Sequence, residues 1–216
     1  MKKVLIVIIV LILIGIGAWF LFGGEKVGEN GETGLSLTEI LDKAKDITSF
    51  KYDMVATAPG ETAITTKMWR KGEKMRMEGT FEGKSMVYLV DVGTQLAYMY
   101  FPAENTAMKI GLSKAQETSG DSPTEQSESV MDYNPVTLGT EVLDGKTCLV
   151  IEYTDEIGNT KMWIWTRYGI TIRTEMTTAK GTSVVELKNI DFGNISDSMF
   201  ELPANVQLMT IPSFDF

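Results

Sequence analysis

The sequence contains no histidine and a single cysteine, Cys148, among its 216 residues. Without histidine, the chain lacks the commonest general base and the commonest metal ligand, and it can form no Ser-His or Cys-His nucleophile pair. A lone cysteine forms no internal disulfide, and we expect Cys148 to be a small buried hydrophobic residue. No pair of carboxylates in an apolar setting marks an acid and a base. We therefore predict that the protein is not an enzyme and needs no cofactor.

Basic residues are scarce relative to acidic ones. The chain has 20 Lys and Arg against 29 Asp and Glu, and without Lys2 and Lys3 the remainder has 18 against 29, a net charge of −11. Such a charge repels nucleic-acid phosphates and anionic headgroups. We expect no nucleic-acid partner.

The sequence has one long apolar run, Val4–Phe22, which contains no charged residue. As a helix it would cover roughly 28 Å, close to the hydrocarbon thickness of a bilayer. Lys2 and Lys3 precede the run and place the N-terminus in the cytoplasm. A cleaved signal peptide is the alternative, but its apolar region is normally shorter and ends in a small-x-small site, whereas large aromatic residues follow Ala18. We predict that residues 1–23 are a single-pass anchor in the cell membrane and that the rest is extracytoplasmic.

The anchor is followed by a tether and then by an amphipathic helix. Residues 24–34 are polar and rich in glycine, as in flexible linkers. From Ser36 to about Phe50 apolar residues recur at helical spacing, and Ser36 with Glu39 forms a capping-box pattern. One helix is therefore expected to open a folded domain at residues 35–216.

After this helix the period changes to two. Short strands are separated by glycine-containing turns at Lys71-Gly72, Glu82-Gly83 and Val92-Gly93, and by the turn "PAENT". Residues 113–134 are polar, contain Gly120, and interrupt the strands, so we predict a lid inserted between two strand blocks. About nine to eleven antiparallel strands, one helix and one insertion predict a single α+β domain.

Several segments in this order carry a resemblance to a known superfamily. The helix is followed by "WRKGEKMRME", "YLVDVGTQLAYMYFP", the insertion, "LGTEVLDGKTCLVIEY", "KMWIWTRYGITIRTE" and the ending "NISDSMFELPANVQL". This pattern resembles the LolA/LolB-like superfamily of lipoprotein and lipid carriers, whose relatives include mycobacterial lipid-transfer lipoproteins and the sensor domain of RseB-type regulators. The resemblance implies a strongly curved antiparallel sheet, an incomplete β-barrel, whose concave side is closed by helices around a cavity for acyl chains.

The sequence also departs from that superfamily. It lacks the cysteine to which the lipoprotein members attach lipid, because Cys148 lies far from the N-terminus. It also has Trp165 where the superfamily hairpin often has an aspartate. A carrier that diffuses freely between two membranes is therefore not expected.

Alternation along the strands suggests which residues face a cavity. In "KMWIWT" Met162 and Ile164 share one side of the strand, and Trp163 and Trp165 share the other. The resemblance favours Ile164 on the inner side, so we place Trp163 and Trp165 at the cavity mouth. A core filled only by the protein's own side chains is the alternative. The predicted lining of the apolar cavity is Met75, Met77, Tyr98, Leu149, Ile151, Tyr153, Ile164, Ile172, Val185 and Leu187.

Methionine is abundant, with 13 residues spread along the chain. Its flexible, polarizable side chain fills irregular cores and also forms surfaces that accept varied apolar ligands. A copper site built from thioethers is a sharper alternative, but only Met75 and Met77 are spaced for it, and strand alternation already explains that spacing. The sequence therefore predicts no metal site.

Two functions fit these patterns. The first is a membrane-tethered binding protein that holds a lipid, an acyl chain or an isoprenoid between sheet and helix, as a carrier or chaperone. The second is a sensor or scaffold whose sheet binds a protein partner and holds no lipid.

Overall fold

The computed structural model describes residues 36–81, 83–112 and 130–210. The predicted anchor and tether and most of the predicted lid lie outside these ranges. No helix within the described ranges is both long enough and apolar enough to cross a bilayer.

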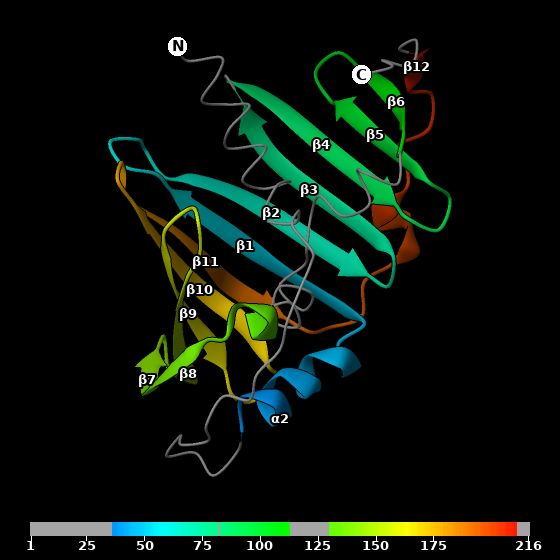
Figure 1. Ribbon diagram of the computed structural model, residues 1–216. Helices are drawn as coiled ribbons and strands as arrows, with labels where there is room; N and C mark the ends of the chain where they lie inside the picture. The colour runs from blue at the N-terminus through cyan, green and yellow to red at the C-terminus, as the bar shows by residue number, and fades with distance from the viewer. Residues whose placement is uncertain (1–35, 82, 113–129, 211–216) are drawn as a thin grey trace. The chain divides into compact units, whose positions relative to one another are not determined.

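The described chain is built mainly of strands (Figure 1). One α-helix, α2 (Leu37–Asp42), continues into a short 3-10 helix, η1 (Lys43–Asp46). Two further 3-10 helices are η2 (Val130–Tyr133) and η3 (Asp197–Phe200). The strands are β1 (Ser49–Thr57), β2 (Ile64–Lys71), β3 (Lys74–Phe81), β4 (Lys84–Asp91), β5 (Leu96–Phe101), β6 (Thr106–Gly111), β7 (Val136–Leu143), β8 (Lys146–Thr154), β9 (Asn159–Trp165), β10 (Ile170–Thr178), β11 (Gly181–Asp191) and β12 (Gln207–Thr210).

Hydrogen bonds join the twelve strands of the described chain in the order β12-β6-β5-β4-β3-β2-β1-β11-β10-β9-β8-β7. From β2 to β6 and from β7 to β11, each strand pairs antiparallel with the next one in sequence, whereas β12 pairs parallel with β6. The α+β class is as predicted. The twelve strands exceed the nine to eleven expected.

The helix is shorter than the predicted span from Ser36 to about Phe50. The capping box is confirmed, because Ser36 Oγ accepts a hydrogen bond from the Glu39 backbone and the Glu39 carboxylate accepts one from the Ser36 backbone at 2.7 Å. The helical geometry ends at Asp46, and β1 begins three residues later. Phe50 is fully buried and Tyr52 is 7% exposed, so a strand alternation starts at Phe50, at the end of the segment expected to be helical.

The described residues divide into two compact units that interleave along the chain. Unit 1 contains residues 36–47, 55–64 and 130–188, and unit 2 contains residues 48–54, 65–112 and 189–210, apart from residue 82. Each unit is described by itself below.

In unit 1, α2 packs on one face of β8 and β9. Direct cross-strand partners share a face of a sheet, and Leu149 pairs with Ile164 while Ile151 pairs with Met162. These four residues form a buried cluster with Ile40, Leu41 and Val130, and every member is at most 4% exposed.

The turn between β9 and β10 lies against the backbone of α2. Gly169 has φ +71°, and a Cβ atom there would lie 2.2 Å from the carbonyl oxygen of Ile40. Lys43 Nζ also donates a hydrogen bond to the carbonyl of Thr166, at 2.7 Å. Only glycine combines this backbone conformation with so close an approach, which explains its place in the hairpin.

In unit 2, the segment that contains η3 lies against one face of the strands β2 and β3. Arg76 donates from Nη1 to the carbonyl of Met199 at 2.8 Å, and Lys71 Nζ donates to the carbonyl of Ile195 at 3.1 Å. In Figure 1 this segment runs behind β3 and β4. Val87 and Leu89 on the strands and Ile195 in the segment are each at most 6% exposed. This side of unit 2 is therefore a packed core.

Candidate ligand-binding face

The other face of the unit 2 strands carries a row of methionines. Met68 pairs with Met77, and Met77 pairs with Tyr88. Tyr88 pairs with Met99, and Met99 pairs with Met108. Met108 pairs with Met209 of the parallel strand β12. Since directly paired residues share a face, the row crosses six strands and consists of Met68, Met77, Tyr88, Met99, Met108 and Met209.

The residues beside this row are also mostly apolar. Residues two positions along each strand share its face, so the alternation adds apolar neighbours on both sides of the row. We name the whole surface the methionine face. Besides the row, it comprises Thr66, Arg70, Met75, Gly79, Phe81, Lys84, Met86, Val90, Ala97, Phe101, Thr106, Ile110 and Gln207.

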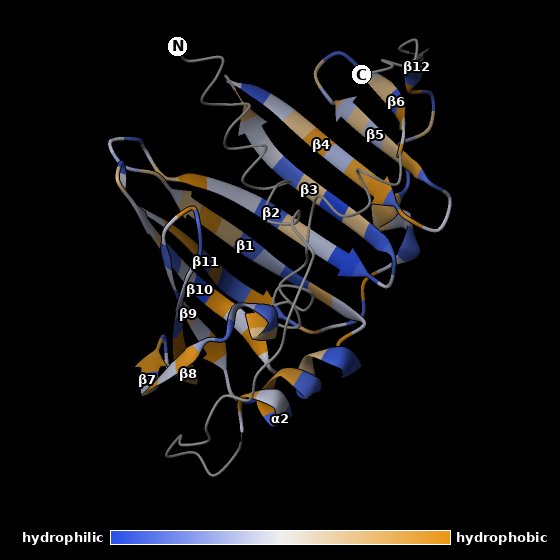
Figure 2. Ribbon diagram, viewed as in Figure 1, coloured by the Kyte–Doolittle hydropathy of each residue, from blue (hydrophilic) through white to orange (hydrophobic). Residues whose placement is uncertain are grey.

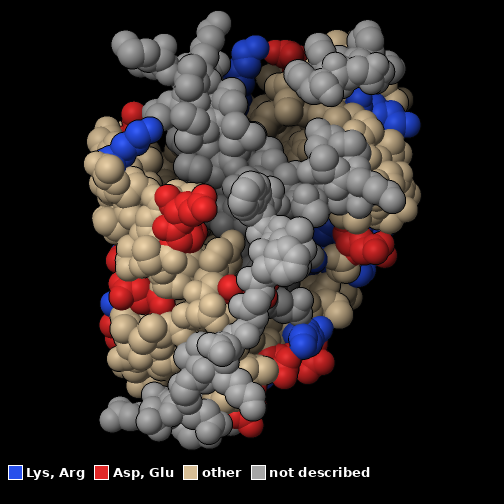
Figure 3. Space-filling view, in the orientation of Figure 1, with Lys and Arg blue, Asp and Glu red and all other residues tan. Residues whose placement is uncertain are grey.

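No carboxylate occupies a described strand position of the methionine face on β2 to β6 or β12, although the chain carries 29 acidic residues. The two cationic members, Arg70 and Lys84, lie at strand ends. Figure 2 shows the hydropathy along these strands, and Figure 3 shows the charged side chains on the visible surface of the protein. The described strand positions of this face therefore suit contact with apolar groups, because none of them carries an acidic side chain.

The methionine face is neither fully buried nor fully exposed. Met68 is 8% exposed, the next members of the row are half-buried, and Met209 is 45% exposed. Burial raises the pKa of the Tyr88 phenol above its usual value. Within the described part of unit 2 the one helical segment, η3, lies on the opposite face. No described helix of this unit thus fills the methionine face as α2 fills the sheet of unit 1.

The predicted cavity residues are divided between the two units, and most of them are in unit 1. Leu149, Ile151, Tyr153, Ile164 and Val185 share the face of unit 1 that carries α2, and alternation places Leu187 there too. Leu149, Ile151 and Ile164 belong to the buried cluster, Tyr153 packs against it, and Ile172 is 2% exposed at a β-bulge.

The other predicted cavity residues are in unit 2. Met75 and Met77 lie on the methionine face, as the pairing of Met75 with Val90 and of Met77 with Tyr88 shows. Tyr98 pairs with Leu89, which places it on the covered face instead. The register therefore separates Tyr98 from the two methionines. Contact of any of these residues with a ligand stays a prediction.

The two tryptophans lie on the face of the unit 1 sheet opposite Ile164, as alternation predicted. Trp163 is 6% exposed, and its Nε1 donates to Glu141 Oε2 at 2.8 Å. Lys161 Nζ and Arg173 Cζ lie 4.6 and 5.3 Å from the centre of the Trp163 ring, within the range of cation–π attraction. Trp165 packs edge-on against Tyr168, with ring centres 4.6 Å apart. The cover of Trp163 is thus largely a layer of charged side chains.

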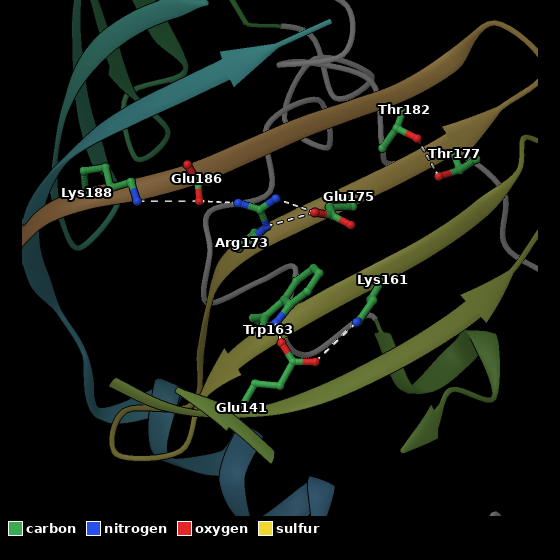
Figure 4. A network of polar contacts seen from close by, with 9 residues as sticks. All are labelled: Glu141, Lys161, Trp163, Arg173, Glu175, Thr177, Thr182, Glu186 and Lys188. Carbon is green, nitrogen blue, oxygen red and sulfur yellow. Dashed lines mark hydrogen bonds and ion pairs between the residues drawn. The ribbon is translucent and has the colours of Figure 1, made fainter. Parts of the chain in front are cut away.

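These charged side chains form a network across β9, β10 and β11 (Figure 4). Arg173 is paired with both Glu175 and Glu186, and Lys188 with Asp144 at 2.7 Å. The hydrogen bond from Trp163, helped by Lys161 and Arg173, holds the pKa of the Glu141 carboxyl below its usual value. The cations already have acidic partners, so this face offers no obvious anion site.

Other reactive groups are scarce. Cys148 is fully buried, and burial raises the pKa of its thiol to about 11, which keeps it protonated and unreactive at neutral pH. Among the described residues no group of three Asp, Glu, Cys or His side chains could hold a metal ion. The methionine face is the strongest candidate site.

No family model and no curated protein matches this sequence. Solved structures do match. An uncharacterized conserved protein from Thermus thermophilus matches with a TM-score of 0.58 and 11% identity, over 81% of this chain and 98% of that one. A chain of the MucA/MucB complex of Pseudomonas aeruginosa matches with a TM-score of 0.53 and 13% identity, over 81% of this chain and 64% of that one.

A LolA superfamily protein from Nitrosomonas europaea is also matched, with a TM-score of 0.35 and 15% identity, over 78% of this chain and 98% of that one. At these identities the likeness concerns the fold alone. The chain spans slightly less than two thirds of the matched chain in the MucA/MucB complex. The predicted resemblance to a superfamily whose relatives include RseB-type regulators is confirmed as a resemblance of fold by the match to MucB.

Proposed function

We propose that this protein is an extracytoplasmic binding protein, tethered to the membrane by residues 1–23, that holds a lipid, an acyl chain or an isoprenoid on its methionine face. The observation that carries the proposal is the row of five methionines and one tyrosine across six strands. Unbranched thioether side chains adapt to ligands of irregular shape better than branched aliphatic ones do. A chain-like apolar ligand would give the half-buried row the dispersion contacts that a closed core supplies.

The absence of carboxylates from the described part of this face also supports an apolar ligand. An ionised group beside a hydrocarbon chain would have to give up its hydration, which costs free energy. We propose that Met75 and Met77, the predicted lining residues that lie on this face, contact the ligand. The predicted lining residues of unit 1 that pack against α2 would instead support the fold.

A fluorescent fatty-acid analogue tests this proposal on the full-length chain in mild detergent. Met99→Gln combined with Met108→Gln should weaken probe binding by about tenfold or more, because a buried amide without a partner costs roughly 1–3 kcal/mol. Met131→Gln is the matched control, since Met131 is 39% exposed in unit 1 and should leave binding unchanged. Native mass spectrometry should also reveal a co-purified apolar ligand. Equal binding by the parent and the double variant would contradict the proposal.

The second candidate is a sensor or scaffold that binds a protein. One of the matched folds belongs to a complex of two proteins, MucA and MucB. In this chain, β7 is a terminal strand of the described sheet, and its side chains Val136, Leu138 and Val142 are 59%, 51% and 73% exposed. Exposed apolar edge strands are sites where an extended segment of another protein can add to a sheet. Binding of a protein partner that is lost in Leu138→Lys but kept in the methionine variants would favour this function.

A further inference from the structure

Three methionines of the methionine face lie on adjacent strands at one end of the row. Met99 on β5 is the direct partner of Met108 on β6, and Met108 is the direct partner of Met209 on β12. We propose that these three thioethers bind a soft monovalent cation, Cu(I) or its redox-stable analogue Ag(I). This site is separate in chemistry from lipid binding, although it uses part of the same face.

The type of ligand selects the metal. Thioether sulfur is a soft, neutral ligand that favours Cu(I) and competes poorly for the hard cations Mg²⁺ and Ca²⁺, which require oxygen ligands. The chain has no histidine, and its only thiol, Cys148, is buried in unit 1. The described strand positions around the three methionines carry no carboxylate. Zn²⁺, which is bound by thiolate, imidazole and carboxylate, therefore finds none of its usual ligands on this face.

The geometry of a sheet allows the three sulfur atoms to converge. Neighbouring strands are about 4.8 Å apart, so the Cα atoms of Met99 and Met209 lie roughly 10 Å apart with Met108 between them. Each side chain has three rotatable bonds, which lets the two outer thioethers lean toward the middle one. Met99 and Met108 are half-buried and Met209 is 45% exposed, so a cation can enter from solvent beside Met209.

The other end of the row provides an internal comparison. Met68 and Met77 also face each other, but Tyr88 takes the place of a third methionine, and Met68 is only 8% exposed. Only two thioethers are directly paired at this end, and access to them is poor, so they should bind a soft cation more weakly than the three directly paired, more accessible ones. The site is thus assigned to the end of the row where β12 joins the sheet.

The experiment titrates Ag(I) into the full-length chain carrying Cys148→Ala, which removes the thiol as a competing ligand. Binding is followed through the ε-methyl resonances of isotope-labelled methionine and by competition with a coloured chelator for Cu(I) under reducing conditions. The triple variant with Met99→Leu, Met108→Leu and Met209→Leu keeps the size and apolar character of the face but lacks thioethers. The matched control is Met68→Leu with Met77→Leu.

We expect Ag(I) to shift three methyl resonances first, and the triple variant to bind at least tenfold more weakly, which is the lower end of the loss caused even by outer-shell changes at metal sites. The Met68, Met77 control should retain most of the affinity of the parent. Binding of the fatty-acid probe is measured separately on the parent protein without metal, so that failure of Ag(I) binding and failure of the proposed function are distinguishable. Absence of Ag(I) binding by the parent, or equal binding by the folded triple variant, overturns the assignment.

Discussion

The two units fill an apolar sheet face in different ways. In unit 1 the face of β8 and β9 is made of branched residues and one methionine, and α2 and η2 close it so that every cluster member is at most 4% exposed. In unit 2 the corresponding residues are chiefly unbranched methionines, and exposure rises along the row to 45% at Met209. Branched side chains have few rotamers and specify one packing, whereas methionine accommodates several. We infer that unit 1 is built for stability and the methionine face of unit 2 for binding.

The largest effect is expected from Ile164→Ala. Ile164 is fully buried between the sheet and α2, so the substitution should lower the free energy of unfolding by roughly 2–5 kcal/mol. Urea denaturation followed by circular dichroism measures it. A loss well below 1 kcal/mol would mean that this face of unit 1 contains space, contrary to the comparison.

A smaller effect is expected from Ile151→Trp, which adds volume to the same cluster. If Ile151 lined a cavity, the indole would be accommodated and only ligand binding would change. Because Ile151 is fully buried against its neighbours, we expect destabilisation of about 1–3 kcal/mol from overpacking. If the variant were as stable as the parent but did not bind the fatty-acid probe, the result would mean that the lipid site lies in unit 1 and that Ile151 lines it.

Met99→Ala on the methionine face tests the same difference between the two units from the side of unit 2. Met99 is half-buried, and no described helix of unit 2 covers it, so truncation should cost only about 1 kcal/mol, below the range for fully buried methionines. The same urea experiment applies. A cost as large as that of Ile164→Ala would show that the face is a closed core.

The smallest effect concerns Glu141→Gln on the outer face of unit 1. The depressed pKa of Glu141 contributes stability that is present above the carboxylate pKa of the unfolded chain and is lost as pH falls through the pKa of the folded state. Glu141 is about half exposed, so the loss at neutral pH should be below about 1 kcal/mol. Unfolding midpoints measured from neutral to acidic pH should converge for the parent and the variant. A constant difference would indicate that the charge of Glu141 is not involved.

Local signals in the sequence predicted local structure. The Ser36–Glu39 capping box, the glycine turns and the opposite faces of Ile164 and Trp163 follow from residues that are neighbours along the chain, and the structure confirms them. The start of β1 was missed because Phe50 fits both the end of a helical stripe and the start of an alternating strand. This error lies where two local patterns overlap.

The methionine face could not be predicted in the same way. Its row depends on cross-strand register, which joins residues far apart in sequence, and Met209 joins Met108 only through a parallel pairing. The sequence therefore indicated that Met75 and Met77 share a face, but gave no sign that Tyr98 lies on the opposite one. Long-range pairing of this kind is set by the whole sheet and leaves no periodic signature in a single strand.

The parallel strand β12 has a consequence for the timing of assembly. It is held beside β6 by a ladder that begins with the hydrogen bond from the Gln207 backbone to the Asn105 carbonyl at 3.0 Å, and Asn105 also donates from its side chain to the carbonyl of Asn205 at 2.9 Å. Chains are synthesised from the N-terminus, so β12 emerges from the ribosome after every other described strand. The row of methionines can be completed only after nearly all of the described chain is translated. On the proposed function, the nascent chain would therefore be anchored in the membrane before its methionine face is complete.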